Sequence, residues 1–306
     1  MTAPLINADA LRGAVRVTPA RTTPLPPAVD AAPASTFWDF AGAMQKRAIG
    51  VATVIAPPIL VLAAMLLFWE IVTAGPKASL PSPTKIWADA KDLIVSPFFN
   101  NGPQDLGLGW RVLVSLERVV YGFGLAAIVG VALGALVGQS QWAMRGLDPI
   151  FQVLRTVPPL AWLPLSLAAF RDANPSAIFV IFITSIWPVI INTAVGIRNI
   201  PQDYRNVAAV LQLNQVEFFW RIMVPAAAPY IFTGLRIGVG LSWLAIVAAE
   251  MLTGGVGIGF FIWDAWNSSR LSDIIVALVY IGIVGFLLDR FVALLGRFAA
   301  RGTAAA

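Results

Sequence analysis

Six long apolar runs constrain this chain of 306 residues more strongly than any other feature of its sequence. A helix needs about 20 predominantly apolar residues to cross the hydrocarbon core of a bilayer. Runs of this length lie at residues 48–72, 119–139, 149–170, 173–197, 230–252 and 273–295. A segment in lipid must satisfy its own backbone hydrogen bonds, so we expect each run to be a helix. The sequence therefore predicts an all-α integral membrane protein with six transmembrane helices.

The composition supports this class and excludes several others. Hydrophobic residues make up 58% of the chain and charged residues 12%, whereas a soluble domain has about 25% charged residues. The chain has no Cys and no His. Their absence excludes disulfides and thiolate metal sites, and it removes the commonest general base and metal ligand. We therefore expect no catalytic residue, no metal site and no enzyme activity.

The net charge of +5 fits either nucleic acid or anionic lipid as a partner. Many Lys and Arg residues lie near the ends of the apolar runs, and no basic patch carries interleaved aromatic residues. Membrane lipid is therefore the expected partner, and nucleic acid is not. Basic residues are also more frequent in the loops that are cytoplasmic when the N-terminus is inside, so we predict that orientation.

The N-terminal segment differs from the rest of the chain. It is rich in Ala, Pro and Thr, and it lacks the apolar core of a secretory signal. An amphipathic targeting peptide is the alternative, but repeated prolines oppose a helix there. We expect a disordered cytoplasmic extension at 1–45 and a transmembrane domain at 46–300.

The second apolar run has a small residue at every fourth position. These residues are Gly122, Ala126, Gly130, Gly134 and Gly138. Such a stripe lets a neighbouring helix approach closely, so this face is expected to contact protein. The sequence leaves open whether that contact is within one subunit or between two copies.

Several apolar runs contain charged residues, and four of these are candidates for a functional role: Glu70, Arg155, Arg236 and Glu250. A charge in hydrocarbon is costly, so each needs a partner or a water-filled cavity. Arg236 and Glu250 lie about 21 Å apart along one helix and cannot pair with each other. Glu250 fits either a pair with another helix or a polar position beside a transport pathway. Arg155 would add positive potential to a route for anions.

The loop between the fourth and fifth runs is amphipathic and helical in pattern. Apolar residues such as Val207, Leu211 and Phe219 alternate with polar ones such as Arg205 and Glu217. A helix this apolar outside the bilayer needs the membrane surface or a partner groove to cover it.

This loop resembles the cytoplasmic coupling segment of bacterial binding-protein-dependent ABC importer permeases. That segment reads Glu-Ala-Ala, three residues, Gly, nine residues, Ile, one residue, Leu-Pro. The corresponding residues here are Asn206, Val207, Ala208, Gln212, Ile222, Val224 and Pro225. The spacing is kept, while Asn206 and Gln212 depart from the pattern. These departures predict a weaker capping charge and a less sharp turn.

Further motifs are similar to the branch of this family that imports nitrate, bicarbonate, taurine and alkanesulfonates. They lie at 80–83, 158–165, 233–236 and 248–251. The insert at 96–103, with the glycines of 107–109 after it, is most similar to nitrate-type permeases.

The resemblance implies the type I importer architecture and a transport function driven by other chains. ATP and Mg would bind separate ATPase subunits docked at 203–225. The glycine-rich stretch 254–259 lacks the lysine that a phosphate-binding loop requires. A periplasmic or lipoprotein solute-binding protein would deliver substrate, and a second permease copy, in a homodimer, would complete the channel in the bacterial inner membrane.

The resemblance also implies the candidate site residues. The coupling residues are Asn206, Val207, Ala208, Gln212, Glu217, Ile222, Val224 and Pro225. The translocation-pathway residues are Arg155, Trp162, Arg236 and Glu250.

Nitrate, with nitrite beside it, is the expected substrate. Bicarbonate, cyanate, taurine or an alkanesulfonate is the alternative for the same machinery. A secondary anion transporter is a competing class that requires inverted repeats and carboxylates near the midplane, and the sequence displays no clear repeat. A membrane enzyme is a third class, which the lack of His and Cys opposes.

Overall fold

The computed structural model describes residues 37–75, 78–102 and 105–304. Residues 1–36 of the predicted extension at 1–45 lie outside the described residues. The rest of that extension belongs to a helix that begins at Phe37. Within the described ranges the chain is helical, apart from loops and an isolated bridge between Asn100 and Leu106. The all-α prediction is confirmed.

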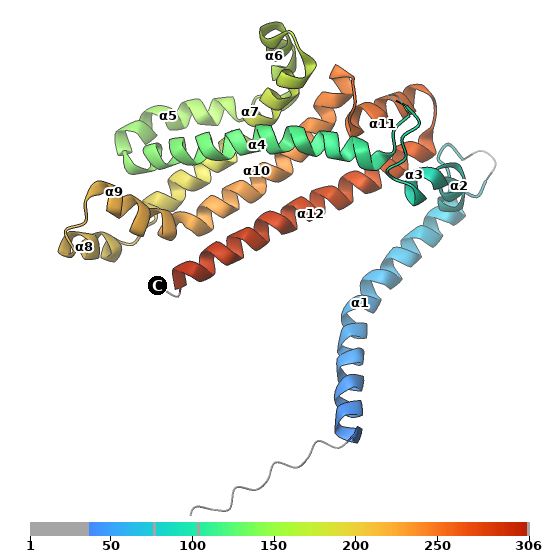
Figure 1. The fold of residues 1–306 in the computed structure, drawn as a ribbon, viewed down its shortest axis with the longest axis horizontal. Helices are drawn as coiled ribbons and strands as arrows, with labels where there is room; N and C mark the ends of the chain where they lie inside the picture. Colours follow the sequence, from blue (N-terminus) through green and yellow to red (C-terminus); the bar gives the residue numbers. More distant parts are fainter. Residues whose placement is uncertain (1–36, 76–77, 103–104, 305–306) are drawn as a thin grey trace, which may run out of the picture. The chain divides into compact units, whose positions relative to one another are not determined.

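The helices follow one another along the chain with short connections (Figure 1). They are α1 Phe37–Thr73, α2 Pro83–Asp89, α3 Lys91–Val95, α4 Leu108–Gln139, α5 Gln141–Leu154, the 3₁₀ turn η2 Pro159–Trp162, α6 Leu163–Phe170, α7 Ala173–Arg198, α8 Gln202–Val210, α9 Gln215–Phe218, the π-helical turn η3 Phe219–Met223, α10 Val224–Thr253, α11 Ile258–Asn267 and α12 Leu271–Ala304.

Five helical segments among the described residues are long and apolar enough to cross a membrane. They are Thr53–Thr73, Leu108–Gln139, Ala173–Arg198, Gln215–Thr253 and Leu271–Ala299. A sixth span results if the bent pair Gln141–Leu154 and Pro159–Phe170 is taken together. The six predicted runs thus correspond to five continuous helices and one broken one.

The prediction of a single helix at 149–170 was wrong. The chain breaks after Leu154, and the two helices on either side of the break are bent by 92°. Pro158 and Pro159 explain the break, because proline lacks the backbone N–H and disfavours helical backbone at the residue before it. The break places Arg155 at the corner of the bend.

The chain divides into two compact units, Met1–Ala63 and Ala64–Ala306. The described part of the first unit is the beginning of α1, whose apolar side chains from Val54 to Leu62 are exposed. A helix that is apolar on all sides and uncovered in its own unit is suited to lipid or to another protein.

In the second unit, α7 packs most extensively against α4 and α10, and α12 packs on α10. The small-residue stripe of α4 forms one of these contacts. A Cβ at Gly122 would lie 2.7 Å from the Cβ of Ile181, and one at Gly134 would lie 2.6 Å from the Cβ of Thr193. Only glycine allows α4 and α7 to approach this closely. The stripe therefore serves packing within one subunit.

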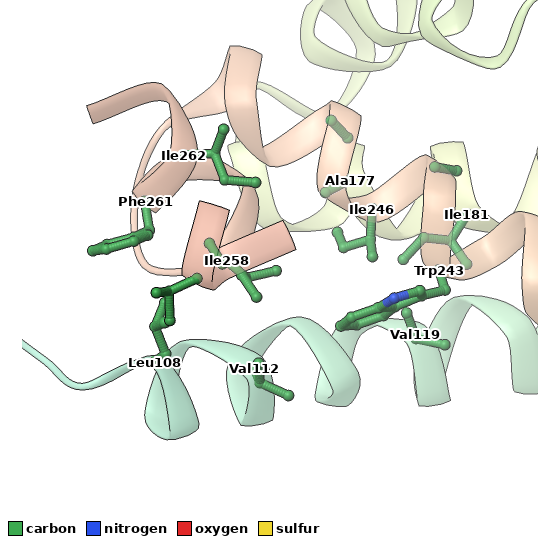
Figure 2. Packing of buried hydrophobic residues seen from close by; sticks show 14 of the residues in the cluster. Leu108, Val112, Val119, Ala177, Ile181, Trp243, Ile246, Ile258, Phe261 and Ile262 are labelled. Carbon is green, nitrogen blue, oxygen red and sulfur yellow. The ribbon is translucent and has the colours of Figure 1, made fainter. Parts of the chain in front are cut away.

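The main core cluster lies where α4, α10 and α11 meet (Figure 2). Leu108 and Ile258 are fully buried there, together with Trp243, whose indole N–H donates to the Ile281 carbonyl at 2.9 Å. The amphipathic stretch before residue 119 is the first part of α4, and its apolar residues Leu108 and Val112 belong to this core.

Candidate functional site

The connection after α8 is a tight turn that Gln212 completes. The Leu213 amide donates to the Ala208 carbonyl at 3.1 Å, and the Gln212 amide donates to the Ala209 carbonyl at 3.2 Å. With φ of 50° at Gln212, these bonds form a Schellman motif, in which glycine is the usual residue. The expectation of a less sharp turn at Gln212 was wrong. The turn is kept, and Gln212 adopts the left-handed backbone that a glycine would.

Helix α9 begins with a capping box. The Asn214 side chain accepts from the Glu217 amide at 2.8 Å, and the Glu217 carboxylate accepts from the Asn214 amide at 3.1 Å. This exchange satisfies two amides at the helix start. We had expected weak capping at Asn206, but that residue lies inside α8. The cap is at Asn214, which the Asn-x-x-Glu spacing in the sequence signals.

The segment α8–η3 has a buried face and an exposed apolar face. Ala208 and Met223 are buried, while Ile222, Val224 and Pro225 are partly covered. Other apolar side chains of the segment are exposed: Val207 at 52%, Val210 at 82% and Trp220 at 65%. Isolated exposed apolar residues are common, but several on one short helical hairpin mark a contact surface.

Glu250 lies at the other end of the same bundle, and it is 0% exposed. Arg118 Nη1 donates to its carboxylate at 2.6 Å, Ser115 Oγ lies 2.8 Å from Oε2, and the Gly259 amide donates at 3.0 Å. The Ile258 amide donates in turn to Ser115 Oγ at 3.1 Å. A buried charge with this many partners is held in one geometry.

The glycine-rich stretch 254–259 closes around this carboxylate. A Cβ at Gly257 would overlap the Glu250 carboxyl group, and one at Gly259 would overlap the Val247 carbonyl. Arg118 also donates to the Val256 carbonyl at 2.9 Å. These glycines therefore allow the backbone to approach Glu250.

A cavity of about 290 Å³ opens beside the α5–η2 break. Its walls come from the break, from α7 and from α10. The lining residues are Arg155, Thr184, Trp187, Pro188, Ile191, Asn192 and Leu241. Arg155 is exposed and is the charged residue among them.

Residues 126–301 match the family model of the binding-protein-dependent transport system inner membrane component. That match covers more than half of the chain. The chain belongs to this family.

The permease is 61% identical to the nitrate import permease protein NrtB of Synechocystis sp., over 78% of the chain and 86% of that protein. It is 51% identical to the bicarbonate transport system permease protein CmpB of the same organism, over 81% and 90%. A crystal structure of an amino acid ABC transporter with histidines covers 62% of the permease and 92% of that chain, with a TM-score of 0.52 and 14% identity. The expected type I permease fold is thereby confirmed.

Family membership establishes what kind of protein this is. Like its relatives, it is the transmembrane permease subunit of an ABC importer and not an enzyme. Such a subunit works with ATPase subunits and a solute-binding protein. Among the described residues, no group of acidic side chains could hold a metal ion.

The four predicted pathway residues of the permease lie in different surroundings. Glu250 is enclosed, and Arg236 on α10 is paired with Asp289 on α12 at 2.5 Å and 2.7 Å. Arg155 faces the cavity, and Trp162 lies partly buried in η2, after the same break. Of the two interpretations of Glu250, the structure favours the pair with another helix.

Sequence reasoning missed two groups of residues in the permease. The partners of Glu250 at Ser115 and Arg118 come from α4, more than a hundred positions earlier, and no local pattern links them. Thr184 and Asn192 lie in an apolar run that carries no charge. Their own polarity within an otherwise apolar span was the one available signal of a polar cavity.

Glu70, the last of the four charged candidates, has a local role. Its carboxylate accepts from the Thr84 hydroxyl at 2.6 Å and from the Thr84 amide at 3.1 Å. Thr84 is in the first turn of α2, which Ser82 caps. Glu70 therefore joins the end of α1 to the start of α2.

Proposed function

We propose that the permease imports nitrate, and nitrite with it, across the bacterial inner membrane by alternating access. The observation that carries this substrate is the 61% identity to a nitrate import permease protein, against 51% to a bicarbonate permease of the same organism. The two comparisons cover similar shares of the chain, so the difference reflects sequence and not coverage.

ATP and Mg bind to the ATPase subunits, which dock on the segment 203–225. The exposed apolar side chains of Val207, Val210 and Trp220 support this docking, because water does not favour such a surface. The coupling residues Asn206, Gln212 and Glu217 shape this hairpin. Ala208, Ile222, Val224 and Pro225 connect the hairpin to α10 and to the bundle.

The N-terminus is cytoplasmic in this proposal. Helices α8 and α9 lie at one end of the bundle and α2, α3 and α11 lie at the other (Figure 1). The ATPase end is then the cytoplasmic one, and the solute-binding protein delivers the anion at the α11 end. Residues 1–45 form a cytoplasmic extension, and 46–300 form the permease domain.

A second copy of the permease completes the pathway, and lipid covers the remaining apolar surface. Arg155 and Trp162 flank the route of the anion. Arg236 and Glu250 act on that route through the helices they join, because each is already paired within the chain.

Uptake of labelled nitrate into vesicles tests the proposal. The vesicles contain the permease, its ATPase and its binding protein, and uptake is measured with and without ATP at the ATPase side, with bicarbonate and taurine as competitors. ATP-dependent uptake that the competitors leave unchanged is expected. Uptake without ATP would overturn the coupled mechanism, and ATP-dependent uptake of a competitor alone would replace nitrate as the substrate.

A further inference from the structure

The cavity at the α5–η2 break contains a cation that no described residue neutralises. Among the described residues, no hydrogen bond or ion pair engages the guanidinium of Arg155. None of the residues that line the cavity is acidic. An unpaired guanidinium in an apolar part of the bundle is unfavourable unless water or an anion accompanies it.

Packing holds the backbone turn from which this cation projects. Phe151, one turn before Arg155 on α5, packs against Trp187 of α7 with ring centroids 5.8 Å apart. The Arg155 amide donates to the Phe151 carbonyl at 3.0 Å, so the last turn of α5 is intact up to the break. The aromatic pair therefore holds the turn that carries Arg155 against α7.

The cavity lies well inside the span. Thr184 and Asn192 line it from α7, which runs from Ala173 to Arg198. At 1.5 Å per residue, both lie at least about 9 Å from either end of that helix. The cavity is therefore reached along the length of α7 and does not lie at either of its ends.

The polar groups of the wall suit an anion and its water. One N–H of the Asn192 amide donates to the Pro188 carbonyl at 2.8 Å, which fixes the side chain and leaves its second N–H as a donor. The Thr184 hydroxyl donates to the Val180 carbonyl at 2.5 Å, so its oxygen stays an acceptor for water. Arg155 and Asn192 are thus donors for an anion.

The rest of the lining sets the class of anion. Ile191, Leu241 and the faces of the Trp187 ring are apolar, so a strongly hydrated ion loses more solvation here than the wall returns. One guanidinium balances one negative charge, and its planar fork matches two oxygens of a planar oxyanion. A volume of about 290 Å³ also leaves room for several waters, at about 30 Å³ each.

We propose that this cavity is a transit site at which the permease itself holds a small monovalent oxyanion, with Arg155 as its cation and Asn192 as its second donor. The proposal rests on the proposed function of anion import. It adds a selection step inside the membrane, after the binding protein has released its cargo. The remaining water keeps binding weak enough for release, as conduction requires.

The test uses the complete transporter in vesicles, with the wild type measured first. Arg155→Gln is expected to lower ATP-dependent nitrate uptake at least tenfold, while Arg155→Lys, which keeps the charge but loses the fork, lowers it less. Arg145→Gln is the matched control, because it removes an exposed arginine outside the cavity, from α5, the helix that ends just before Arg155. It is expected to transport within twofold of the wild type. Copurification with the ATPase verifies assembly of each variant.

Wild-type uptake by Arg155→Gln would overturn the transit site while leaving nitrate import in place. If Arg155→Gln fails to assemble, nitrate uptake by the Asn192→Leu variant tests the transit site in its place. This variant keeps the side-chain size and removes the donor, so a severalfold loss of uptake supports the site and unchanged uptake overturns it. If the wild type carries another anion, the proposed function fails separately, and the same variants are measured with that anion.

Discussion

The permease holds two membrane-embedded charges in opposite ways. Glu250 is enclosed at the α11 end, where Ser115, Arg118 and the Gly259 amide satisfy its carboxylate. Arg155 is exposed at the α5–η2 break, where no described side chain pairs with it. Both are charges in apolar segments, and the sequence alone does not distinguish their surroundings. Burial and partners separate a charge that fixes structure from one that is available to a ligand.

Removing the Glu250 carboxylate is the strongest test of this difference between Glu250 and Arg155, because it is expected to have the largest effect. Glu250→Ala leaves Arg118 without its ion partner and leaves Ser115 and the Gly259 amide without their acceptor. Breaking a buried pair on one side lowers the free energy of unfolding by about 3–5 kcal/mol. Chemical unfolding of the purified permease in mixed micelles measures this change.

Glu117→Ala is the control, because Glu117 is an exposed carboxylate on α4, one residue before Arg118. It is expected to change the free energy of unfolding by less than about 0.5 kcal/mol. Equal stabilities of the Glu250 and Glu117 variants would show that the enclosed network does not hold the bundle together.

The glycines around Glu250 are the next largest expected effect. In Gly257→Ala the new methyl group overlaps the Glu250 carboxyl group. Overpacking at such a site destabilises by about 1–3 kcal/mol. Gly240→Ala, on α10 with open space around it, is the control and is expected to be neutral or slightly stabilising. A Gly257 variant as stable as the control would mean that the loop at 254–259 adjusts freely.

The turn at Gln212 gives a smaller effect of opposite sign. Because Gln212 has φ of 50°, Gln212→Gly relieves a left-handed backbone and is expected to stabilise the turn by about 0.5–1 kcal/mol. Hydrogen exchange of the amides of Gln212 and Leu213 measures it, since both close the Schellman motif. Ala209→Gly, inside α8, is the control and should destabilise by about 1 kcal/mol. Faster exchange in the Gln212 variant would contradict the motif.

The sequence predicted most of the fold, because apolar length dictates where a chain can cross a bilayer. The prediction fails at 149–170, because the prolines there end one helix and begin another where a single helix is expected. The spacing of the coupling segment placed its turn at Gln212 correctly, while the backbone conformation there became visible only in the structure. The partners of Glu250 and the walls of the Arg155 cavity come from helices distant in sequence, so no local pattern could reveal them.

The last prediction concerns the free energy of unfolding of the Arg155→Gln variant, which we expect to be almost unchanged. Since the guanidinium has no partner among the described residues, Arg155→Gln removes no hydrogen bond or ion pair. The free energy of unfolding should change by less than about 0.5 kcal/mol, the range of exposed substitutions. The same unfolding titration used for Glu250 measures it, and a loss above about 2 kcal/mol would show that Arg155 holds the bend together. If Arg155 is available to a ligand, Arg155→Gln loses transport and keeps its stability. If Glu250 fixes the structure, Glu250→Ala loses stability.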